Sequence, residues 1–425
     1  MTPEVKERIE QIRHGNVPEG YKKTKVGLAP DDWQEVRFKK MFSRLSRRNK
    51  ENNTNVLTIS AQHGLISQED FFNKSIASDD KSNYFLLHKG EFAYNKSYSN
   101  GYPYGALKRL DLYEKGIVSP LYICFTATSE NECTDFYTQY FEAGKMNGEI
   151  HAFAQEGARN HGLLNIAIDD FFNSNLLQPS LSEQKKIAEI LSSQDKTVEL
   201  KENLLVEKQR QKKYLMQQLL TGKKRLPGFD GEWKNVQLNE VLVERKEKNA
   251  NQDHRICSVA VQKGVVDQIE HLGRSYAAAD TSNYGVAHYG DIIYTKSPTG
   301  DFPYGIIKQS QMNEEVAVSP LYGIYEPVCY EMGYLLHTYF SYAANCSNYL
   351  LPIIQKGAKN TINITNDVFV SNKLYLPMEQ GEQKALAEIF ITADSEIELL
   401  RQSIEQEKQK KKALMQLLLT GVVRV

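Results

Sequence analysis

The two halves of this chain repeat each other, and this repeat constrains the fold more than any other feature of the sequence. Residues 101–105 (Gly-Tyr-Pro-Tyr-Gly) return 200 positions later as residues 301–305 (Asp-Phe-Pro-Tyr-Gly). The chain is therefore two copies of a unit of about 200 residues, far longer than the ~20–50-residue period of a solenoid. Two such copies favour a partner with an approximate dyad of its own. The same offset relates further pairs: Trp33 and Trp233, Gln62–Gly64 and Gln262–Gly264, Ser82–Tyr84 and Ser282–Tyr284, Val118–Tyr122 and Val318–Tyr322.

The length of 425 residues allows two or three domains, so each copy can bury its own core. No apolar run approaches the ~18 residues of a membrane helix, and the first residues lack the apolar stretch of a signal peptide. The five cysteines form no C-x-x-C pair, and none recurs in the other copy. We therefore expect reduced thiols, no metal site, no membrane contact and a cytoplasmic location.

The charge is nearly balanced, with 52 basic and 53 acidic side chains and a net charge of −1. This balance argues against strong bulk affinity for nucleic acid, because proteins that bind it usually carry a basic surface. The distribution is uneven, however, since residues 37–50 contain seven bases and no acid. Arg44, Arg47 and Arg48 in this run are candidate DNA contacts, and an ordinary solvated surface is the alternative.

Each copy begins with a mixed part, in which short runs of Tyr, Phe, Ile and Val are separated by polar residues. Residues 90–97 and 290–297 suit a turn that leads into a strand, and the Pro-Tyr-Gly steps that follow suit a turn. We predict an α+β domain in each copy, over residues 17–178 and 223–378.

A long amphipathic helix follows each mixed part, within residues 179–222 and 379–425. Apolar residues recur at alternating spacings of four and three, which is a heptad pattern. Residues 183–220 are 38 residues and span ~57 Å at 1.5 Å per residue. A helix of that length needs a partner for its apolar stripe, so we predict that the two helices pair antiparallel. Ser182 is a candidate N-cap, and Gly222 and Gly421 are candidate stops. The predicted interface residues are Ile187, Leu191, Val198, Leu205, Leu215, Leu386, Phe390, Ile397, Ile404 and Leu414.

The N-terminal segment 1–16 extends this pattern. Residues 8–15 resemble residues 215–222 and end, like them, on glycine. The chain thus begins with the tail of a third helix, which makes the repeat circular. We predict that the two chain ends lie near each other.

Catalytic motifs are missing from the sequence. It has no G-x-x-x-x-G-K-[ST] loop, no H-E-x-x-H, no G-x-S-x-G and no N-P-P-[FY] motif. A His-x-x-acid pair recurs, as His88 with Glu91 and His288 with Asp291, and is either a structural hydrogen bond or part of a metal site. The shared Gly, Pro, Tyr, Asn and Gln residues favour recognition over catalysis.

Several of the matched segments resemble the specificity subunit of type I restriction–modification enzymes. The resemblance covers nearly the whole chain and is strongest in the helix starts 182–191 and 382–390. The Leu-Leu-Thr-Gly ends at 219–222 and 418–421 are also typical. It implies two target-recognition domains, each reading one half of a split asymmetric DNA target, with the two helices as spacers.

The resemblance also implies the partners. They are double-stranded DNA, two methyltransferase subunits that modify adenine, and restriction subunits that translocate DNA and cut it. S-adenosylmethionine, ATP and Mg²⁺ are expected on those partners, and this chain itself is expected to bind no cofactor and to catalyse no reaction.

Polar residues shared by the two copies are the remaining DNA-contact candidates. Gln62 and Gln262 could reach an adenine edge with two hydrogen bonds, or they could serve a turn. Repeated bases flanked by Ser or Asn could touch phosphate, or they could be structural. These residues are Lys96, Lys296, Arg159, Lys359, Asn160 and Asn360. Base-reading residues are expected in the dissimilar loops.

Two other functions remain to be weighed against DNA recognition. A single-chain methylating nuclease would need the motifs that are missing here. A protein scaffold with a coiled-coil hairpin and no DNA ligand would share the helices, but it would not account for the basic run at 37–50.

Overall fold

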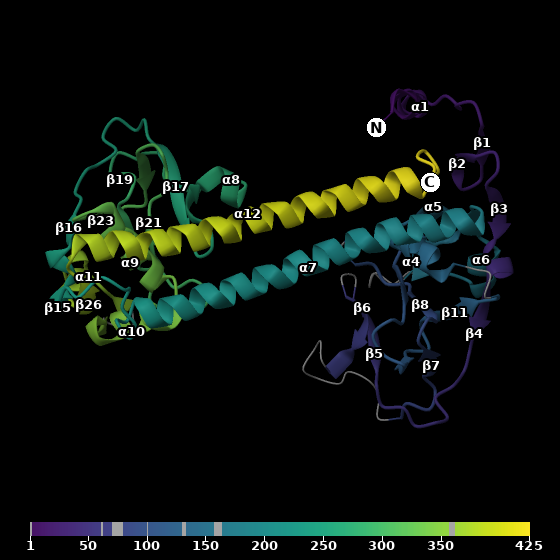
Figure 1. Cartoon of the computed structure of the whole chain (residues 1–425), viewed down its shortest axis with the longest axis horizontal. Coiled ribbons are helices and arrows are strands. Elements are labelled where there is room, and N and C mark those ends of the chain that lie inside the picture. Colours follow the sequence, from purple (N-terminus) through teal and green to yellow (C-terminus); the bar gives the residue numbers. More distant parts are fainter. Residues whose placement is uncertain are drawn as a thin grey trace. The chain divides into compact units, whose positions relative to one another are not determined.

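The chain folds into two units that each combine a mixed domain with parts of both long helices. The first unit comprises Met1–Lys201 and Ser403–Val425, and the second comprises Glu202–Gln402. Helices α7 (Leu181–Leu219) and α12 (Gln380–Leu418) are each shared between the units (Figure 1). The computed structural model describes residues 2–60, 63–69, 80–99, 101–129, 133–156, 164–356 and 362–425.

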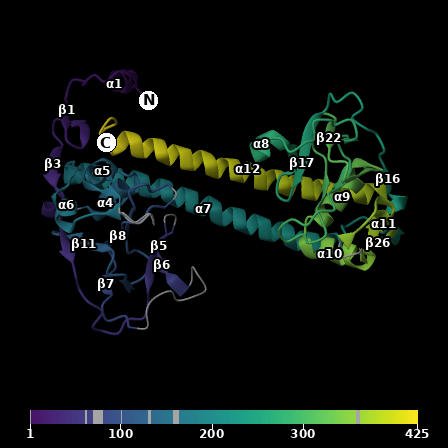
Figure 2. The same cartoon turned by 180° about the vertical axis from the view of Figure 1, so that it is seen from behind.

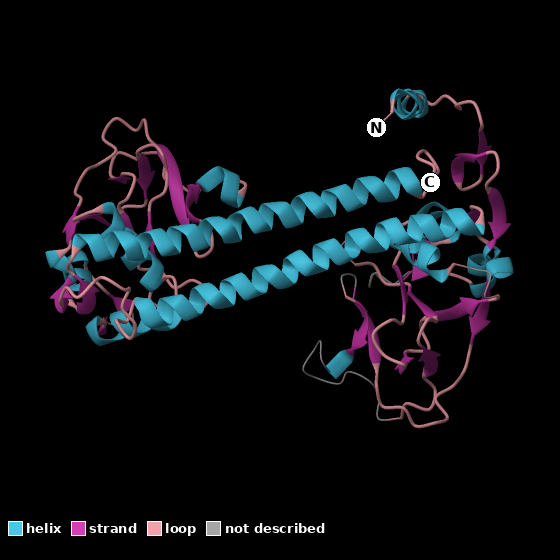
Figure 3. Ribbon diagram, viewed as in Figure 1, coloured by secondary structure: helices cyan, strands magenta, loops and turns pink. Residues whose placement is uncertain are grey.

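The two long helices run antiparallel within each unit, as predicted. In the first unit, Gln194 of α7 donates to Glu407 of α12 at 2.7 Å. In the second unit, which holds the later part of α7 and the earlier part of α12, Lys208 of α7 pairs with Glu396 of α12 at 2.7 Å. Helices α7 and α12 have 39 residues each, and Figure 3 draws each of them as an unbroken helix.

The predicted interface residues lie on the buried side of these helices. Ile187, Leu191, Leu386, Phe390, Ile397 and Ile404 are buried, and Val198, Leu205, Leu215 and Leu414 are half-buried. Polar members of the same seam find partners on the opposite helix. In the first unit, Lys201 binds Glu407 and Lys411 binds Asp195. In the second unit, Lys212 binds Asp394.

The helix ends follow the predicted chemistry with one correction. Gly222 and Gly421 both adopt φ of +68°, the left-handed stop that glycine favours. The predicted N-cap Ser182 was wrong, because α7 begins at Leu181, which places Ser182 inside the helix. Ser180 is the cap, and its Oγ accepts from the Glu183 backbone N–H at 3.3 Å.

The mixed domain of the first unit centres on an antiparallel sheet with strand order β4-β11-β8-β9. Smaller antiparallel pairs are β1-β2, β3-β14, β5-β6, β7-β10 and β12-β13. The strands are β1 (Tyr21–Thr24), β2 (Gly27–Pro30), β3 (Gln34–Arg37), β4 (Phe42–Leu45), β5 (Leu57–Ser60), β6 (Gly64–Ser67), β7 (Phe85–His88), β8 (Phe92–Asn95), β9 (Ala106–Arg109), β10 (Lys115–Val118), β11 (Ile123–Ala127), β12 (Gln155–Glu156), β13 (Leu164–Asn165) and β14 (Asn175–Gln178). The short helices are α1 (Pro3–Arg13), α2 (Phe38–Met41), α4 (Thr134–Glu142), α5 (Asn147–Phe153) and α6 (Ile168–Asn173).

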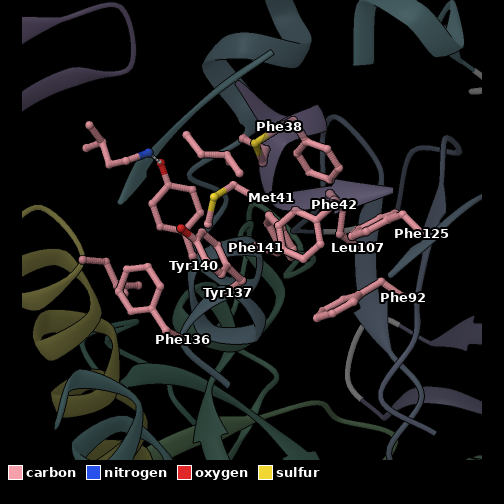
Figure 4. Close-up of a cluster of buried hydrophobic side chains, with 14 of the residues drawn as sticks. Phe38, Met41, Phe42, Phe92, Leu107, Phe125, Phe136, Tyr137, Tyr140 and Phe141 are labelled. Atoms are coloured by element: carbon pink, nitrogen blue, oxygen red, sulfur yellow. Dashed lines mark hydrogen bonds between the residues drawn. The ribbon is translucent and has the colours of Figure 1, made fainter. Parts of the chain in front are cut away.

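Aromatic side chains fill the core of this first domain (Figure 4). The rings of Phe92 and Phe125 stack with their centroids 5.1 Å apart, and Phe42 meets Phe125 edge to face at 5.3 Å. The same cluster includes Ile187 and Leu191 of α7 and Leu418 of α12. The domain and its share of the helix pair therefore have one continuous core.

The second unit repeats this plan, but its described residues form two four-stranded sheets where those of the first unit form one. Its sheets have the orders β16-β23-β20-β21 and β18-β17-β22-β19, and β15-β26 and β24-β25 are separate pairs. Figure 2 shows this unit from behind, with β16, β17, β22 and β26 labelled. The strands are β15 (Trp233–Gln237), β16 (Leu242–Glu244), β17 (Arg255–Ala260), β18 (Gly264–Asp267), β19 (Gly285–Ala287), β20 (Ile292–Tyr294), β21 (Ile307–Gln309), β22 (Val316–Val318), β23 (Gly323–Pro327), β24 (Gln355–Lys356), β25 (Ile362–Asn363) and β26 (Lys373–Pro377). The short helices are α8 (Gln268–Leu272), α9 (Tyr330–Phe340), α10 (Ala343–Leu350) and α11 (Asn366–Ser371), with 3₁₀ turns at Leu238–Glu240 and Leu351–Ile353.

A buried tryptophan anchors each domain to its helices. Trp33 donates its indole N–H to Glu183 at the start of α7, at 3.0 Å, and Arg424 binds the same carboxylate at 2.6 Å. The second unit contains the same trio one repeat later: Trp233, Glu382 and Arg225. Each arginine lies just beyond the end of one long helix and binds at the start of the other.

The two chain ends meet in the first unit, as the circular repeat predicted (Figure 1). Tyr21 donates its hydroxyl to the Gly421 carbonyl at 2.6 Å, and Arg8 of α1 donates to the Val422 carbonyl at 2.7 Å. Arg424 also binds Asp32 at 2.7 Å.

The recurring Pro-Tyr-Gly turn packs against the strand that precedes it. The Tyr94 hydroxyl donates to the Tyr104 carbonyl at 2.6 Å, and Tyr294 donates to Tyr304 at 2.7 Å. The glycine that follows has φ of +78° in the first copy and +101° in the second. A Cβ on Gly305 would lie only 2.8 Å from the Lys296 backbone nitrogen, so this turn requires glycine.

We expect Gly305→Ala to destabilise the second unit by about 2–5 kcal/mol, since a left-handed alanine costs ~1–2 kcal/mol and overpacking ~1–3 kcal/mol. Gly264→Ala is the matched control, because Gly264 also has positive φ but its Cβ would meet nothing within 4 Å. Its cost should stay near ~1–2 kcal/mol. Urea unfolding of both full-length variants measures the difference. Equal losses would show that the close approach at residue 305 does not matter.

Candidate nucleic-acid interface

The basic run at residues 37–50 divides into arginines with different surroundings. Arg44 is exposed on β4, an edge strand of the central sheet, opposite Phe125 of β11. Arg48 lies against the Phe85 ring, with its guanidinium carbon 4.7 Å from the ring centroid, and donates to the Asn83 carbonyl. Arg44 therefore keeps a guanidinium directed to solvent, whereas Arg48 already has contacts within the domain.

Arg47 forms a two-pronged ion pair with the buried Glu91, at 2.9 and 3.1 Å. Glu91 also accepts the backbone N–H of His88 at 2.7 Å. The guanidinium of Arg47 is therefore engaged within the domain and is not part of the interface proposed below.

The second copy preserves this arrangement with a displaced arginine. Arg245 binds Asp291 at 2.7 Å, and Asp291 accepts the backbone N–H of His288 at 2.8 Å. Burial raises the pKa of Asp291, and the hydrogen bond from Arg245 opposes that rise. In both copies, then, the acid of the recurring His-x-x-acid pair is a structural carboxylate that holds a turn and an arginine together.

The two repeated lysines differ in their settings. Lys96 follows β8, is half-buried, and its carbonyl accepts from the Leu164 N–H at 3.0 Å. Lys296 follows β20 with φ of +61°, a conformation uncommon for a side-chain-bearing residue. Burial lowers the pKa of Lys296. Both backbones shape the Pro-Tyr-Gly region, and phosphate contact stays a prediction for both.

Gln262 lies at the exposed connection between β17 and β18, beside Lys263. The sequence reasoning missed Lys263, although it directly follows the repeated glutamine. This connection borders a groove of about 720 Å³ within the second unit. Basic residues of this lining are Lys212, Lys213, Lys263, Lys308 and Arg401.

The floor of this groove is polar and buried. Lys308 donates to the Ser341 hydroxyl at 3.1 Å, and burial lowers its pKa to about 8. His337 Nδ1 accepts the Gln309 backbone N–H at 3.0 Å, and burial lowers its pKa to about 3. His337 is therefore neutral at neutral pH and acts as a structural acceptor.

Five candidate residues lie outside the described part of the chain: Gln62, Arg159, Asn160, Lys359 and Asn360. In sequence, the last four follow β12 and β24, the first strands of two short antiparallel pairs at equivalent places in the two copies. Their contact with DNA stays a prediction.

In the described residues, no helix is both long enough and apolar enough to cross a membrane. The five cysteines, all of them in described segments, are free. Burial raises the pKa of Cys124 to about 12 and of Cys346 to about 12, so neither thiol ionises near neutral pH.

A curated relative is similar in sequence to most of the chain. The type I restriction enzyme MjaVIII specificity subunit of Methanocaldococcus jannaschii is 26% identical over 301 residues, which covers 64% of this chain and 68% of that protein. No family model matches the chain.

Two solved structures share the fold. The S subunit of a type I restriction–modification system from M. genitalium has a TM-score of 0.54 at 13% identity, over 91% of this chain and 96% of that one. A chain from a structural study of type I complex assembly and conformational transition has a TM-score of 0.51 at 16% identity, over 93% and 99%. The sequence-based resemblance is therefore confirmed: this chain is similar in sequence to a type I restriction–modification specificity subunit and shares the fold of another.

Proposed function

We propose that this chain is the DNA-reading specificity subunit of a type I restriction–modification complex. Each mixed domain reads one half of a split asymmetric target in double-stranded DNA. Two methyltransferase subunits modify adenine, and restriction subunits translocate and cut the DNA. The chain itself supplies recognition without catalysis, and S-adenosylmethionine, ATP and Mg²⁺ act on the partner subunits.

One observation carries this proposal: the two domains share a scaffold but carry different side chains at equivalent places. Arg44 pairs with Phe125 across two strands, and Glu244 pairs with Tyr325 at the same register 200 residues later. An exposed arginine in one copy is thus replaced in the other by a half-buried acid, which accepts a hydrogen bond from Asn366. A repeated scaffold with divergent polar surfaces suits two half-sites of different sequence.

The chemistry of the exposed residues suits base reading. Arginine and lysine bind the O6 and N7 acceptors of guanine, and glutamine binds adenine through two hydrogen bonds. Arg44 in the first domain, and Gln262 with Lys263 in the second, are exposed residues of these types. Phosphate contacts supply much of the affinity in protein–DNA complexes. The net charge of −1 fits a complex in which partner subunits share those contacts.

The paired helices are proposed to set the spacing between the half-sites. Charged and amide residues in the seam support this role, because polar seam positions fix the register of paired helices. Gln194, Lys201 and Glu407 form one such polar layer in the first unit. Lys208 with Glu396 and Lys212 with Asp394 form further pairs in the second.

Exchanging residues 17–175 for the corresponding segment of a related subunit should change one half of the methylated target only. The reason is that the first domain folds on its own scaffold and is joined to α7 by contacts that both copies share. Methylome sequencing of cells that carry the exchanged chain and its partners gives the result. A change in both half-sites, or in the spacer between them, would contradict modular reading.

Arg44→Ala should weaken DNA binding by the assembled complex while leaving the stability of the chain within ~0.5 kcal/mol, as is usual for surface substitutions. If Arg44 reads a base, the affinity loss should be ~1–3 kcal/mol and specific to one base pair. If it touches phosphate, the loss should be uniform and the salt slope should fall by ~1.

Arg47→Ala is the matched control for that experiment. It should destabilise the chain by about 1–3 kcal/mol, because Glu91 loses its charged partner in a partly buried site. DNA titrations at several salt concentrations, with unfolding curves for both variants, separate the two roles. If the complex shows no salt-dependent DNA binding at all, the chain is a protein scaffold instead.

Adding four residues to one long helix should lengthen the spacer by one or two base pairs and weaken binding, with both half-sites unchanged. Four residues add ~6 Å at 1.5 Å each, nearly two base-pair steps of ~3.4 Å. They also misalign the polar pairs of the seam, and a stutter can absorb part of the shift. Methylation mapping reports the spacer directly. An unchanged spacer at full activity would mean that the helices do not set it.

A further inference from the structure

Three strand ends in the second domain bring two carboxylates and an imidazole together. His288 follows β19, and Glu315 precedes β22, which runs antiparallel to β19 so that the two residues face each other. Glu247 lies beside them, because its carbonyl accepts the Val286 backbone N–H at 3.1 Å. One ligand atom from each of the three side chains lies within 4.8 Å of the others.

The distances within this group are short, and the group is open to solvent. His288 Nε2 is 2.9 Å from Glu247 Oε2, and His288 Nδ1 is 3.8 Å from Glu315 Oε1. The side chain of His288 is 30% exposed, and those of Glu247 and Glu315 are 44% and 53% exposed. An ion can therefore enter from solvent without any rearrangement of the core.

A second imidazole, that of His254, faces the same group. Its Nδ1 lies 2.9 Å from Asn249 Oδ1, and its Nε2 lies 3.3 Å from Glu315 Oε2. Asn249 is fully buried, and its Oδ1 also accepts the His254 backbone N–H at 3.3 Å while its amide donates to Thr281. The amide orientation is thus fixed, and the acceptor oxygen faces Nδ1.

This fixed acceptor decides which nitrogen of neutral His254 is free. Nδ1 carries the proton that Asn249 accepts, so the Nε2 lone pair points toward the Glu315 carboxylate. A lone pair and a carboxylate oxygen repel unless a proton or a metal ion lies between them. A histidine whose second nitrogen donates to a protein oxygen is also the usual arrangement of a metal ligand.

The nearby cations do not neutralise the two carboxylates. Arg245 comes within 4.0 Å of Glu247, but it is held by the buried Asp291 at 2.7 Å and also binds Glu326. Asp253, 2.9 Å from His254 Nδ1, adds a further negative charge. Glu247, Glu315 and Asp253 thus place three carboxylates close to the two imidazoles.

The first domain offers an internal comparison. His88 stands where His288 does, and Lys115 faces it at the register of Glu315. Arg47 occupies the place of Glu247, because its carbonyl accepts the Leu86 N–H just as Glu247 accepts Val286. Two cations thus replace the two carboxylates, and the first domain cannot bind a cation there.

We propose that Glu247, His288 and Glu315 form a binding site for a divalent transition metal in the second domain, beside His254. An imidazole nitrogen with two carboxylate oxygens suits Zn²⁺, which binds both kinds of ligand, better than Mg²⁺ or Ca²⁺, which prefer oxygen alone. The ion would join the ends of β19 and β22 to Glu247. This site does not depend on the proposed DNA function.

Zinc titration of the untagged full-length chain tests the site, with calorimetry and thermal unfolding as readouts. At a hundredfold excess over Kd, Zn²⁺ should raise the unfolding midpoint by roughly 5–10 °C. His288→Gln should lower zinc affinity at least about tenfold, since even outer-shell changes around metals cost about 10–100-fold. Co²⁺ in place of Zn²⁺ should give visible absorption from nitrogen ligation.

His88→Gln is the matched control and should bind zinc as the native chain does. Glu315→Lys, which copies the first domain at Lys115, provides a second test if His288→Gln folds poorly. The proposal is overturned if the native chain shows neither a zinc-dependent midpoint shift nor a cobalt band. It is also overturned if His88→Gln weakens zinc binding as much as His288→Gln, or if only Mg²⁺ or Ca²⁺ binds.

Discussion

A buried glutamate at the start of each long helix is the point on which the rest of each unit depends. Glu183 and Glu382 are 4% and 1% exposed, and burial of an unpaired carboxylate would be costly. Each is matched by an indole N–H from its own domain and by an arginine that follows the end of the opposite helix. One carboxylate thus joins the domain, the start of one helix and the end of the other. The position of each domain relative to the adjoining helix ends follows from this junction.

Much of this architecture could be predicted from the sequence, because it rests on short-range patterns that occur twice. The heptads identified the helix pair, and Gly222 and Gly421 marked the helix ends. The cap at Ser180 was missed because Ser182, which directly precedes Glu183 in the sequence, is also a residue that commonly caps helices. The partners of the polar seam residues could not be read from spacing alone: Gln194 meets Glu407, 213 residues away.

The candidate interface was harder to predict, since a charge run does not show which side chains are already paired. Arg44 and Arg47 look alike in sequence, yet only Arg47 has a buried acid within reach, 44 residues further along the chain. In both copies the acid of the His-x-x-acid pair makes a structural hydrogen bond, which was one of the two alternatives for this pair. The histidine of the second copy nevertheless faces a different pair of carboxylates, because Glu247 takes the place of Arg47, and the displaced Arg245 binds Asp291 at 2.7 Å and lies 4.0 Å from Glu247.

Residues Ser403–Val425 complete the first unit, and this has a consequence for the order of folding. During synthesis the first domain and the start of α7 emerge long before Arg424, so Glu183 lacks its arginine partner until residue 424 has been made. Contacts across 241 residues also carry the loop-closure entropy that slows folding. The residues of the second unit are contiguous, so Arg225, Trp233 and Glu382 have all been made by the time that unit is complete. A chain that stops before Arg424 would therefore lose a contact of the domain that was made first.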